Sequence, residues 1–194
     1  MKNNTPKRTK LIYGVGINDA NYTVSATTNP LTSRCNFYTK WIGMLERCYS
    51  GSNHKKRPTY TGCTVTSEWL LFSNFRSWMV KQDWQGKQLD KDILIQNNKI
   101  YCPSTCIFVT SEINKLLNKY VNRRGVYPRG VSLYKNRYAA HCCAYGKLRH
   151  VGHYDTPEEA HQAYKEFKYK HIAEIANQQS EPLRTALLNY KIEG

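Results

Sequence analysis

The largest group of side chains that could bind a charged ligand lies between Arg123 and His153 of this 194-residue chain. The stretch contains seven Lys or Arg residues and no Asp or Glu, whereas residues 154–194 contain five Lys or Arg and seven Asp or Glu. Four tyrosines and three histidines lie among the basic residues: Tyr127, Tyr134, Tyr138, Tyr145, His141, His150 and His153. Positive charge gathered in this way favours a polyanionic partner, above all a nucleic acid. The alternative is a small solvated basic sheet without a partner.

The whole chain is also basic, with a formal net charge of +15 and a pI near 9.5. No apolar run reaches the length of a membrane span, and the first ten residues lack the apolar core of a signal peptide. Seven cysteines, two of them adjacent, do not form the pattern of a secreted disulfide framework and indicate reduced thiols. We therefore expect a cytoplasmic protein with no membrane partner and no small-molecule substrate.

Glycines and turn residues divide the basic stretch into strands expected at 130–134, 137–145 and 148–153, and a helix is expected to follow. Asp155-Thr156-Pro157-Glu158-Glu159 is a strong helix start, because it joins a cap residue, a first-turn proline and two acids. Strand alternation predicts one face packed on this helix. That face is expected to carry Val131, Leu133, Tyr138, Ala140, Cys142 and Val151.

The basic residues at the strand ends and turns are expected to meet phosphates, which position a protein on a nucleic acid without conferring sequence preference. They are Arg129, Lys135, Arg137, Lys147 and Arg149. His141, His150 and His153 are expected on the same surface. A metal site there is disfavoured, because no Cys or carboxylate lies at ligand spacing from them.

Residues 129–164 resemble the APETALA2-type DNA-binding domain of plant ethylene-response factors and of phage and bacterial homing endonucleases. The features that carry the resemblance are Arg129-Gly130-Val131, Arg137-Tyr138-Ala139-Ala140, Val151-Gly152-x-Tyr154, and Asp155 to Ala160 leading to Tyr164. The resemblance implies that a three-stranded sheet enters the major groove of double-stranded DNA, with the helix behind it. The groove-facing positions would then include Ser132, Tyr134, His141, Cys143 and His150. Plant members carry Arg and Trp at most of these positions, so the DNA sequence recognised must differ, and RNA stays an alternative partner.

The sequence of residues 11–120 predicts short helices and strands. A hairpin is expected over 11–24 with its turn at 18–21, then a helix from Phe37 to about Gly51, a polar loop over 50–60, a short strand and an aromatic-rich helix. Residues 88–120 suggest strands at 92–95, 99–101 and 107–109, followed by a helix capped by Thr110 or Ser111.

Residues 89–114 resemble the ββα element of HNH (His-Me finger) endonucleases, as carried by phage homing-type proteins. The matching residues are Leu89-Asp90-Lys91-Asp92, Asn97 to Ile100, Thr105 to Val109 and Ser111 to Asn114. The resemblance implies a catalytic set of Asp90, Lys91, Asp92 and Asn114, in which Asp90 and Asn114 would hold Mg²⁺ or Mn²⁺. The family places its general-base His where this chain has Lys91, and a lysine is protonated near neutral pH unless strongly desolvated. Asp92 or His54 could supply the missing function.

Some HNH proteins also carry a structural Zn²⁺. Only Cys102 and Cys106 have local ligand spacing here, and zinc sites usually show two such pairs, so we expect no zinc while leaving the pair open.

Together these patterns predict an α+β protein of two domains. Residues 1–120 would form a degenerate ββα, HNH-like domain, and residues 121–194 a three-stranded antiparallel sheet packed on one helix. The leading hypothesis is a DNA-binding phage protein of the infected bacterial cytoplasm with an inactive or weak nuclease domain. An active metal-dependent nicking endonuclease and a host-interaction factor are the alternatives, and the oligomeric state stays open.

Overall fold

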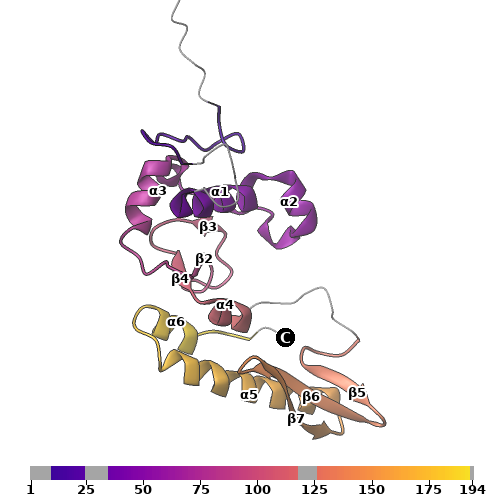
Figure 1. The fold of residues 1–194 in the computed structure, drawn as a ribbon. Helices are drawn as coiled ribbons and strands as arrows, with labels where there is room; N and C mark the ends of the chain where they lie inside the picture. Colours follow the sequence, from indigo (N-terminus) through magenta and orange to yellow (C-terminus); the bar gives the residue numbers. More distant parts are fainter. Residues whose placement is uncertain (1–9, 25–34, 118–125, 193–194) are drawn as a thin grey trace, which may run out of the picture. The chain divides into compact units, whose positions relative to one another are not determined.

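The computed structural model describes residues 10–24, 35–117 and 126–192 of a mixed helix-and-strand protein. The chain forms two compact units: Met1–Gln85 with Asn97–Phe108, and Gly86–Gln96 with Val109–Gly194. The described strands form three small sheets, in the orders β1-β3, β2-β4 and β5-β6-β7 (Figure 1). The domain boundary expected near residue 120 lies outside the described residues.

The first unit is mainly helical. Its helices are α1 (Asn36–Tyr49), α2 (Gly51–Lys56) and α3 (Phe72–Met79), with 3₁₀ turns η1 (Pro58–Tyr60) and η2 (Ser67–Leu70). Strand β1 (Thr64–Val65) pairs in parallel with β3 (Ile100–Tyr101). Strand β4 spans Ile107–Val109, and its last residue belongs to the second unit.

Aromatic side chains fill the core of this unit, as the sequence predicts. Trp41 and Trp69 are completely buried, and the Nε1 of Trp41 donates to the carbonyl of Trp69 at 2.7 Å. Phe72 packs against Trp41 with ring centroids 5.5 Å apart. Large rings bury the most area per residue, so they hold these short elements together without an extended sheet.

Two expectations for this unit were wrong. The turn near the N-terminus lies at Tyr13 and Gly14, where φ is positive, and it closes a bridge between Ile12 and Gly16 instead of a hairpin around 18–21. The polar segment 50–60 is helical, because the side chain of Ser50 accepts a bond from the Asn53 amide and caps α2.

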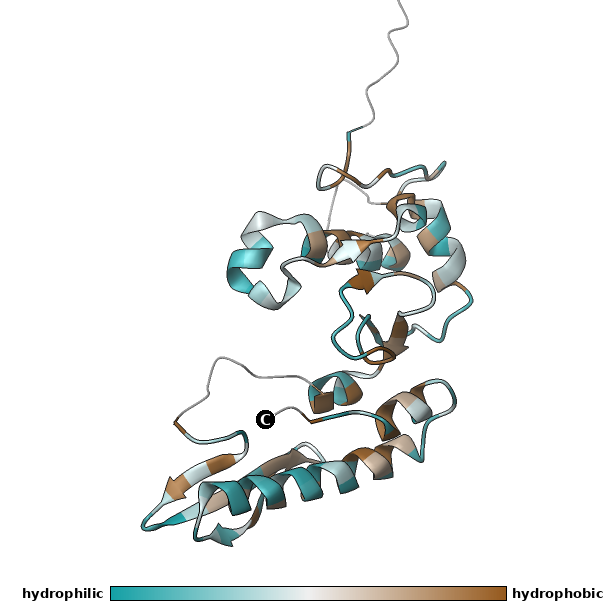
Figure 2. Cartoon of the chain, turned by 180° about the vertical axis from the view of Figure 1, so that it is seen from behind, coloured by the Kyte–Doolittle hydropathy of each residue, from teal (hydrophilic) through white to brown (hydrophobic). Residues whose placement is uncertain are grey.

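The second unit contains β2 (Gln88–Asp90), α4 (Ser111–Leu117), and the sheet of β5 (Val131–Tyr134), β6 (Arg137–Ala144) and β7 (Lys147–Tyr154). Helices α5 (Pro157–Ala176) and α6 (Leu183–Leu188) complete it. The sheet is antiparallel throughout and packs on α5, as predicted. Figure 2 shows hydrophilic residues along the first turns of α5 and more hydrophobic residues toward its end, where α6 packs.

Helix α5 begins where the sequence predicts it. The Thr156 hydroxyl accepts from the amide of Glu159 at 3.2 Å, and the Glu159 carboxylate accepts from the amide of Thr156 at 3.3 Å. This reciprocal capping box satisfies two backbone donors that a helix start otherwise leaves unpaired. Ala140, Cys142, Ala160 and Tyr164 form the buried cluster between sheet and helix.

Hydrogen bonds link the C-terminal segment of this unit to segments that come earlier in its sequence. The backbone of Lys191 exchanges two hydrogen bonds with the side chain of Gln96, at 2.6 and 3.1 Å. The hydroxyl of Tyr190 donates to the carbonyl of Leu117 at 3.1 Å. Segments more than seventy residues apart in sequence are therefore neighbours within this unit.

Candidate nucleic-acid interface

Strand register separates the two faces of the β5-β6-β7 sheet. Residues directly opposite each other in antiparallel strands share a face, so the packed positions Ala140 and Val131 define the side covered by α5. The opposite side, called here the outward face, is defined by the pairs Ser132–Ala139, Tyr134–Arg137, His141–His150, Cys143–Leu148 and Ala139–His153. Four of the five positions predicted to face a DNA groove, Ser132, Tyr134, Cys143 and His150, are exposed, and His141 is half-buried.

A β-bulge brings two histidines to the outward face. His150 pairs with His141 and Gly152 pairs with Ala140, so Val151 is an extra residue in β7. Positions three apart in a regular strand point to opposite faces, and the inserted residue cancels this difference for His150 and His153.

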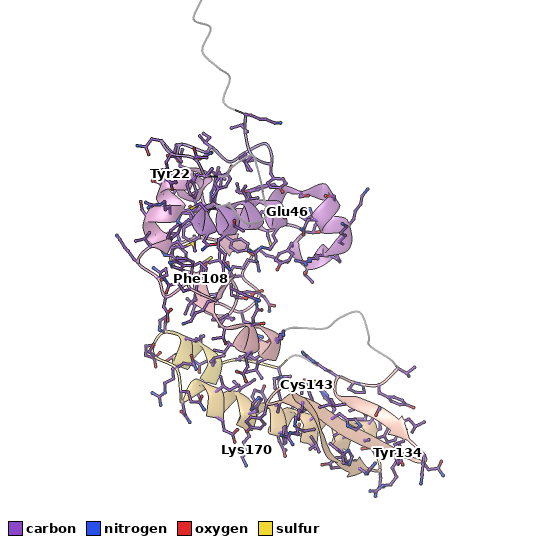
Figure 3. The ribbon with its side chains drawn as sticks, in the orientation of Figure 1. Tyr22, Glu46, Phe108, Tyr134, Cys143 and Lys170 are labelled. Carbon is purple, nitrogen blue, oxygen red and sulfur yellow. The ribbon has the colours of Figure 1, made fainter. Side chains whose placement is uncertain are left out.

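The outward face carries a continuous row of four rings. The ring centroids are 5.3 Å apart for Tyr134–His153, 4.4 Å for His153–His150 and 5.2 Å for His150–His141. Burial lowers the pKa of His141, and the neighbouring imidazoles of His150 and His153 lower it further because a second positive charge nearby is unfavourable. Figure 3 shows Tyr134 and Cys143 on the sheet, with Lys170 on α5.

Basic side chains lie at one end of this row. The Nζ of Lys135, in the β5-β6 turn, lies 5.6 Å from the ring centre of Tyr134. Arg137 donates to the carboxylate of Asp155 at 3.0 Å and to the carbonyl of His153 at 3.2 Å. Both groups of this ion pair are exposed, so it contributes little to stability, but it fixes the direction of the guanidinium.

The other predicted phosphate-binding residues are placed differently. Arg149 lies opposite Cys142 and Lys147 lies opposite Ala144, so both belong to rows of the α5 side, although both are exposed. The guanidinium of Arg149 lies 5.9 Å from the ring centre of Tyr145. Arg129 precedes β5 and is half-buried, with its carbonyl bonded to the ring of His161 at 2.8 Å.

Charge is divided between the two layers of this unit. The strands and turns from 131 to 154 carry Lys135, Arg137, Lys147 and Arg149 and no acidic residue. Helix α5 carries Glu158, Glu159, Glu166 and Glu174 beside three lysines, one of which, Lys168, is buried. Burial lowers the pKa of that lysine. The sheet therefore provides the cationic surface and the helix does not.

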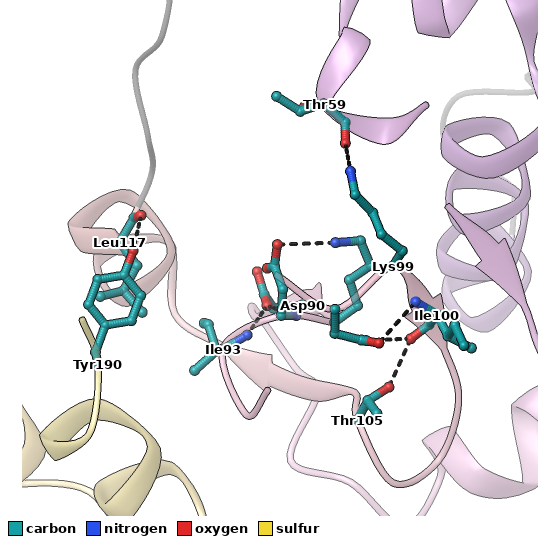
Figure 4. A network of polar contacts seen from close by, with 11 residues as sticks. Thr59, Asp90, Ile93, Lys99, Ile100, Thr105, Leu117 and Tyr190 are labelled. Atoms are coloured by element: carbon teal, nitrogen blue, oxygen red, sulfur yellow. Dashed lines mark hydrogen bonds and ion pairs between the residues drawn. The ribbon is translucent and has the colours of Figure 1, made fainter. Parts of the chain in front are cut away.

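Asp90, the first of the predicted catalytic residues, forms a tight turn after β2. Its Oδ1 accepts from the backbone amides of Asp92 at 2.8 Å and Ile93 at 2.9 Å (Figure 4). This turn replaces the strand expected over 92–95, which was wrong, because a side chain that binds the next amides competes with strand pairing. Burial, and after it the nearby Asp92 carboxylate, raises the pKa of Asp90 to about 6.

The remaining residues of this set are engaged with protein groups. Lys91 is buried, and its ammonium lies 3.1 Å from the Asp92 carboxylate. The amide of Asn114 donates to the side chain of Gln88. Thr110 caps α4 as predicted, since its hydroxyl accepts from the Ile113 amide at 3.3 Å.

These residues do not fit a divalent-metal site. The Oδ1 of Asp90 is hydrogen-bonded to a backbone amide, and the ammonium of Lys91 forms an ion pair with the Asp92 carboxylate. Among the described residues there is no group of three or more His, Cys, Asp or Glu placed to hold a metal ion.

Of the two cysteines left open as zinc ligands, Cys102 contacts neighbouring hydroxyl groups. The sulfur of Cys102 lies 3.3 Å from the Ser104 hydroxyl and 3.2 Å from the Thr105 hydroxyl. Burial raises the pKa of this thiol, but the hydrogen bonds from Ser104 and Thr105 lower it by more, so the pKa is lowered overall. Cys106 is buried.

Sequence reasoning missed three features of the β5-β6-β7 sheet. Leu148 is an outward position, with 66 % of its surface exposed, and Leu133 on the packed side is also half exposed. The Arg137–Asp155 ion pair was not anticipated either. Side-chain alternation counted along the chain from β6 could have placed Leu148 on the outward face. It could not have found the ion pair, because that contact depends on how β7 ends against β6.

Comparison of the chain with protein-family models, curated proteins and solved structures found no match. Within the described residues, no helix is long and apolar enough to cross a membrane.

Proposed function

We propose that this chain is a double-stranded-DNA-binding protein that contacts DNA through the outward face of β5-β6-β7. The observation that carries the proposal is the division of charge: the sheet has four basic residues and no acid, and α5 covers only its other face. The twisted sheet offers rows of exposed hydrogen-bond donors, and a two-stranded ribbon or small sheet fits the width of a major groove.

Each part of the face has a role in the proposal. Lys135 and Arg137 contact phosphates and set the orientation of the sheet on the duplex. Tyr134, His141 and His150 meet base edges. Arg149 and Lys147, which lie on rows of the other side, contact phosphates only at the rim of the groove.

We further propose that the Asp90 turn supports the fold and that the chain does not cleave DNA efficiently. This proposal is supported by the bonds of Asp90 to two backbone amides and by the buried Lys91 at the position of the expected general base. The side chain of Lys91 is engaged with the Asp92 carboxylate, whereas a general base needs a free lone pair to accept a proton from water.

The DNA-binding proposal is tested by reversing charge on the sheet. The variant Lys135→Glu with Arg137→Glu should bind a 30-base-pair duplex about tenfold or more weakly at 150 mM salt. Its slope of log Kd against log salt should fall by about two, one for each phosphate contact removed. Fluorescence anisotropy over 50–300 mM KCl measures both quantities.

A matched control lies on the other layer. Lys170 is exposed on α5, so Lys170→Glu removes the same kind of charge from the face turned away from the proposed interface. It should change the affinity by less than about twofold. Equal weakening by the sheet and helix variants, or unchanged affinity in the sheet variant, would contradict the proposed orientation.

Cleavage is tested with supercoiled plasmid, with Mg²⁺ or Mn²⁺ and with EDTA. Retarded but intact plasmid is expected under all conditions. Relaxed or linear product formed only with metal, and lost in Asp90→Ala, would instead establish a metal-dependent nuclease. Lys91→His tests whether only the base is missing: with folding intact, no gain of nicking supports a structural role for the turn.

A further inference from the structure

The outward face gathers three of the six histidines of the chain, and this arrangement has a chemical consequence. His150 is the central ring, with centroid distances of 5.2 Å to His141 and 4.4 Å to His153. All three side chains are on the face that the proposed function assigns to DNA. A neutral imidazole has one donor and one acceptor nitrogen, whereas the imidazolium has two donors and a positive charge.

The surroundings of the row contain little that would stabilise the imidazolium form in the free protein. On β5 the neighbour is Tyr134, and on β6 the titratable or charged neighbours are Arg137 and Cys143. On β7 the outward neighbour is Leu148, and α5 packs on the opposite face. The described outward face carries no carboxylate, and Asp155 at its end is paired with Arg137.

Burial and the two neighbouring imidazoles lower the pKa of His141, so protonation of this ring is disfavoured in the free protein. A protonated His150 would lie within about 5 Å of two further imidazoles, which discourages a second proton. A DNA phosphate placed over the face reverses this balance, because its negative charge favours the protonated form of each ring it approaches.

We propose that His141, His150 and His153 couple nucleic-acid binding to proton uptake, so that the protein binds more tightly as the pH falls from 8 to 6. The inference rests on the proposed function, because it assigns the outward face to a polyanion. The protons come from solvent and are released when the DNA dissociates. Linkage requires the reciprocal effect: bound DNA must raise the pKa of the rings that take up the protons.

The size of the effect follows from the number of protons. Each proton taken up on binding changes the association constant by up to about tenfold per pH unit. We expect wild-type protein to bind at least about tenfold more tightly at pH 6 than at pH 8 in 150 mM KCl. The salt slope should be steeper at pH 6, since more phosphate charge is then neutralised.

The test is fluorescence anisotropy of the full chain on a 30-base-pair duplex at pH 6, 7 and 8. It compares wild type with His150→Gln and with the triple variant His141→Gln, His150→Gln, His153→Gln. The triple variant should vary by less than about threefold over this range, and its remaining slope measures His54, His161 and His171, which it retains. His150→Phe keeps an aromatic ring at the centre of the row and separates titration from ring packing. Thermal unfolding of each variant reports whether it is folded.

The outcomes separate the two proposals. Wild-type binding that is tight but independent of pH overturns proton coupling and leaves the DNA-binding function standing. A triple variant with the pH dependence of wild type also overturns it. Absence of binding at every pH contradicts the proposed function and this inference together. NMR titration of the histidine ring protons gives an independent result: duplex DNA should raise the midpoints of these three histidines and leave His54 and His171 unchanged.

Discussion

The backbone of Gly130 lies directly against the ring of Tyr164, so that a Cβ atom at position 130 would overlap the ring carbons. Gly130 also has φ of +81°, a conformation that L residues adopt only with strain. This contact joins the start of β5 to the middle of α5 and fixes the distance between the edge strand and the helix. It explains why a glycine follows Arg129 and precedes the sheet.

Gly130→Ala should therefore destabilise the second unit by about 3 kcal/mol, from the overlap with Tyr164 together with the positive φ. Gly146 is the matched control, because its φ is +72° but no atom lies within 4 Å of the added methyl group. Gly146→Ala should cost only about 1 kcal/mol. Urea unfolding followed by circular dichroism measures both, and equal losses would show that the contact with Tyr164 is not the cause.

The capping box at the start of α5 predicts that substitutions in it lower the stability of the protein by different amounts. Thr156→Ala removes the acceptor of the Glu159 amide and should lower the free energy of unfolding by about 1 kcal/mol. Glu159→Gln keeps an oxygen that can accept from the Thr156 amide, so it should cost less than Glu159→Ala. Thermal unfolding of the three variants measures the order of these stability losses. If packing alone held the start of the helix, this order would be reversed or absent.

Asp90 should make stability depend on pH in the direction opposite to that of a salt-bridged carboxylate. Burial, followed in importance by the Asp92 carboxylate, raises its pKa from the usual 3.8 to about 6. The folded state therefore binds the proton more tightly than the unfolded chain. This contribution is fully present below pH 3.8 and is lost as the pH rises through 6, a change of about 3 kcal/mol.

Asp90→Asn tests this expectation, because asparagine keeps an oxygen for the amides of Asp92 and Ile93 but does not titrate. The variant should gain stability relative to wild type between pH 4 and pH 7 in urea unfolding. Asp155→Asn, at an exposed ion pair, should keep the wild-type trend. Parallel curves for wild type and Asp90→Asn would contradict the raised pKa.

Cys102 should react with iodoacetamide faster than Cys106 at pH 7.5. The hydrogen bonds from Ser104 and Thr105 outweigh burial and lower the pKa of the Cys102 thiol, whereas Cys106 is buried. The thiolate is the reactive form, so a lower pKa increases the reactive fraction. Tandem mass spectrometry of the peptide that contains both cysteines measures the rates. Ser104→Ala should slow alkylation of Cys102, and an unchanged rate would mean that access alone sets reactivity.

Local chemistry in the sequence determined much of the second unit. The glycine and turn positions of residues 130–154 indicated three strands, and the Thr156-Pro157-x-Glu159 pattern indicated the start of α5, because these signals act within a few residues. The sorting of basic residues onto the sheet and acidic residues onto the helix was also visible in the chain. Five of the six residues predicted to pack on the helix, Val131, Tyr138, Ala140, Cys142 and Val151, lie in or against the core between sheet and helix, whereas Leu133 is half exposed.

Tertiary structure decided the rest, because those features depend on register and on contacts between distant segments. The bulge at Val151 brings His150 and His153 to one face, which strict alternation cannot do, and the register places Arg149 opposite Cys142 on the other side. The turn at Asp90 replaced an expected strand because its carboxylate binds the amides that a partner strand would have bound. The hydrogen bonds between Gln96 and Lys191 join residues 86–96 to the unit that contains the sheet and α5. No local pattern in the sequence indicates this grouping.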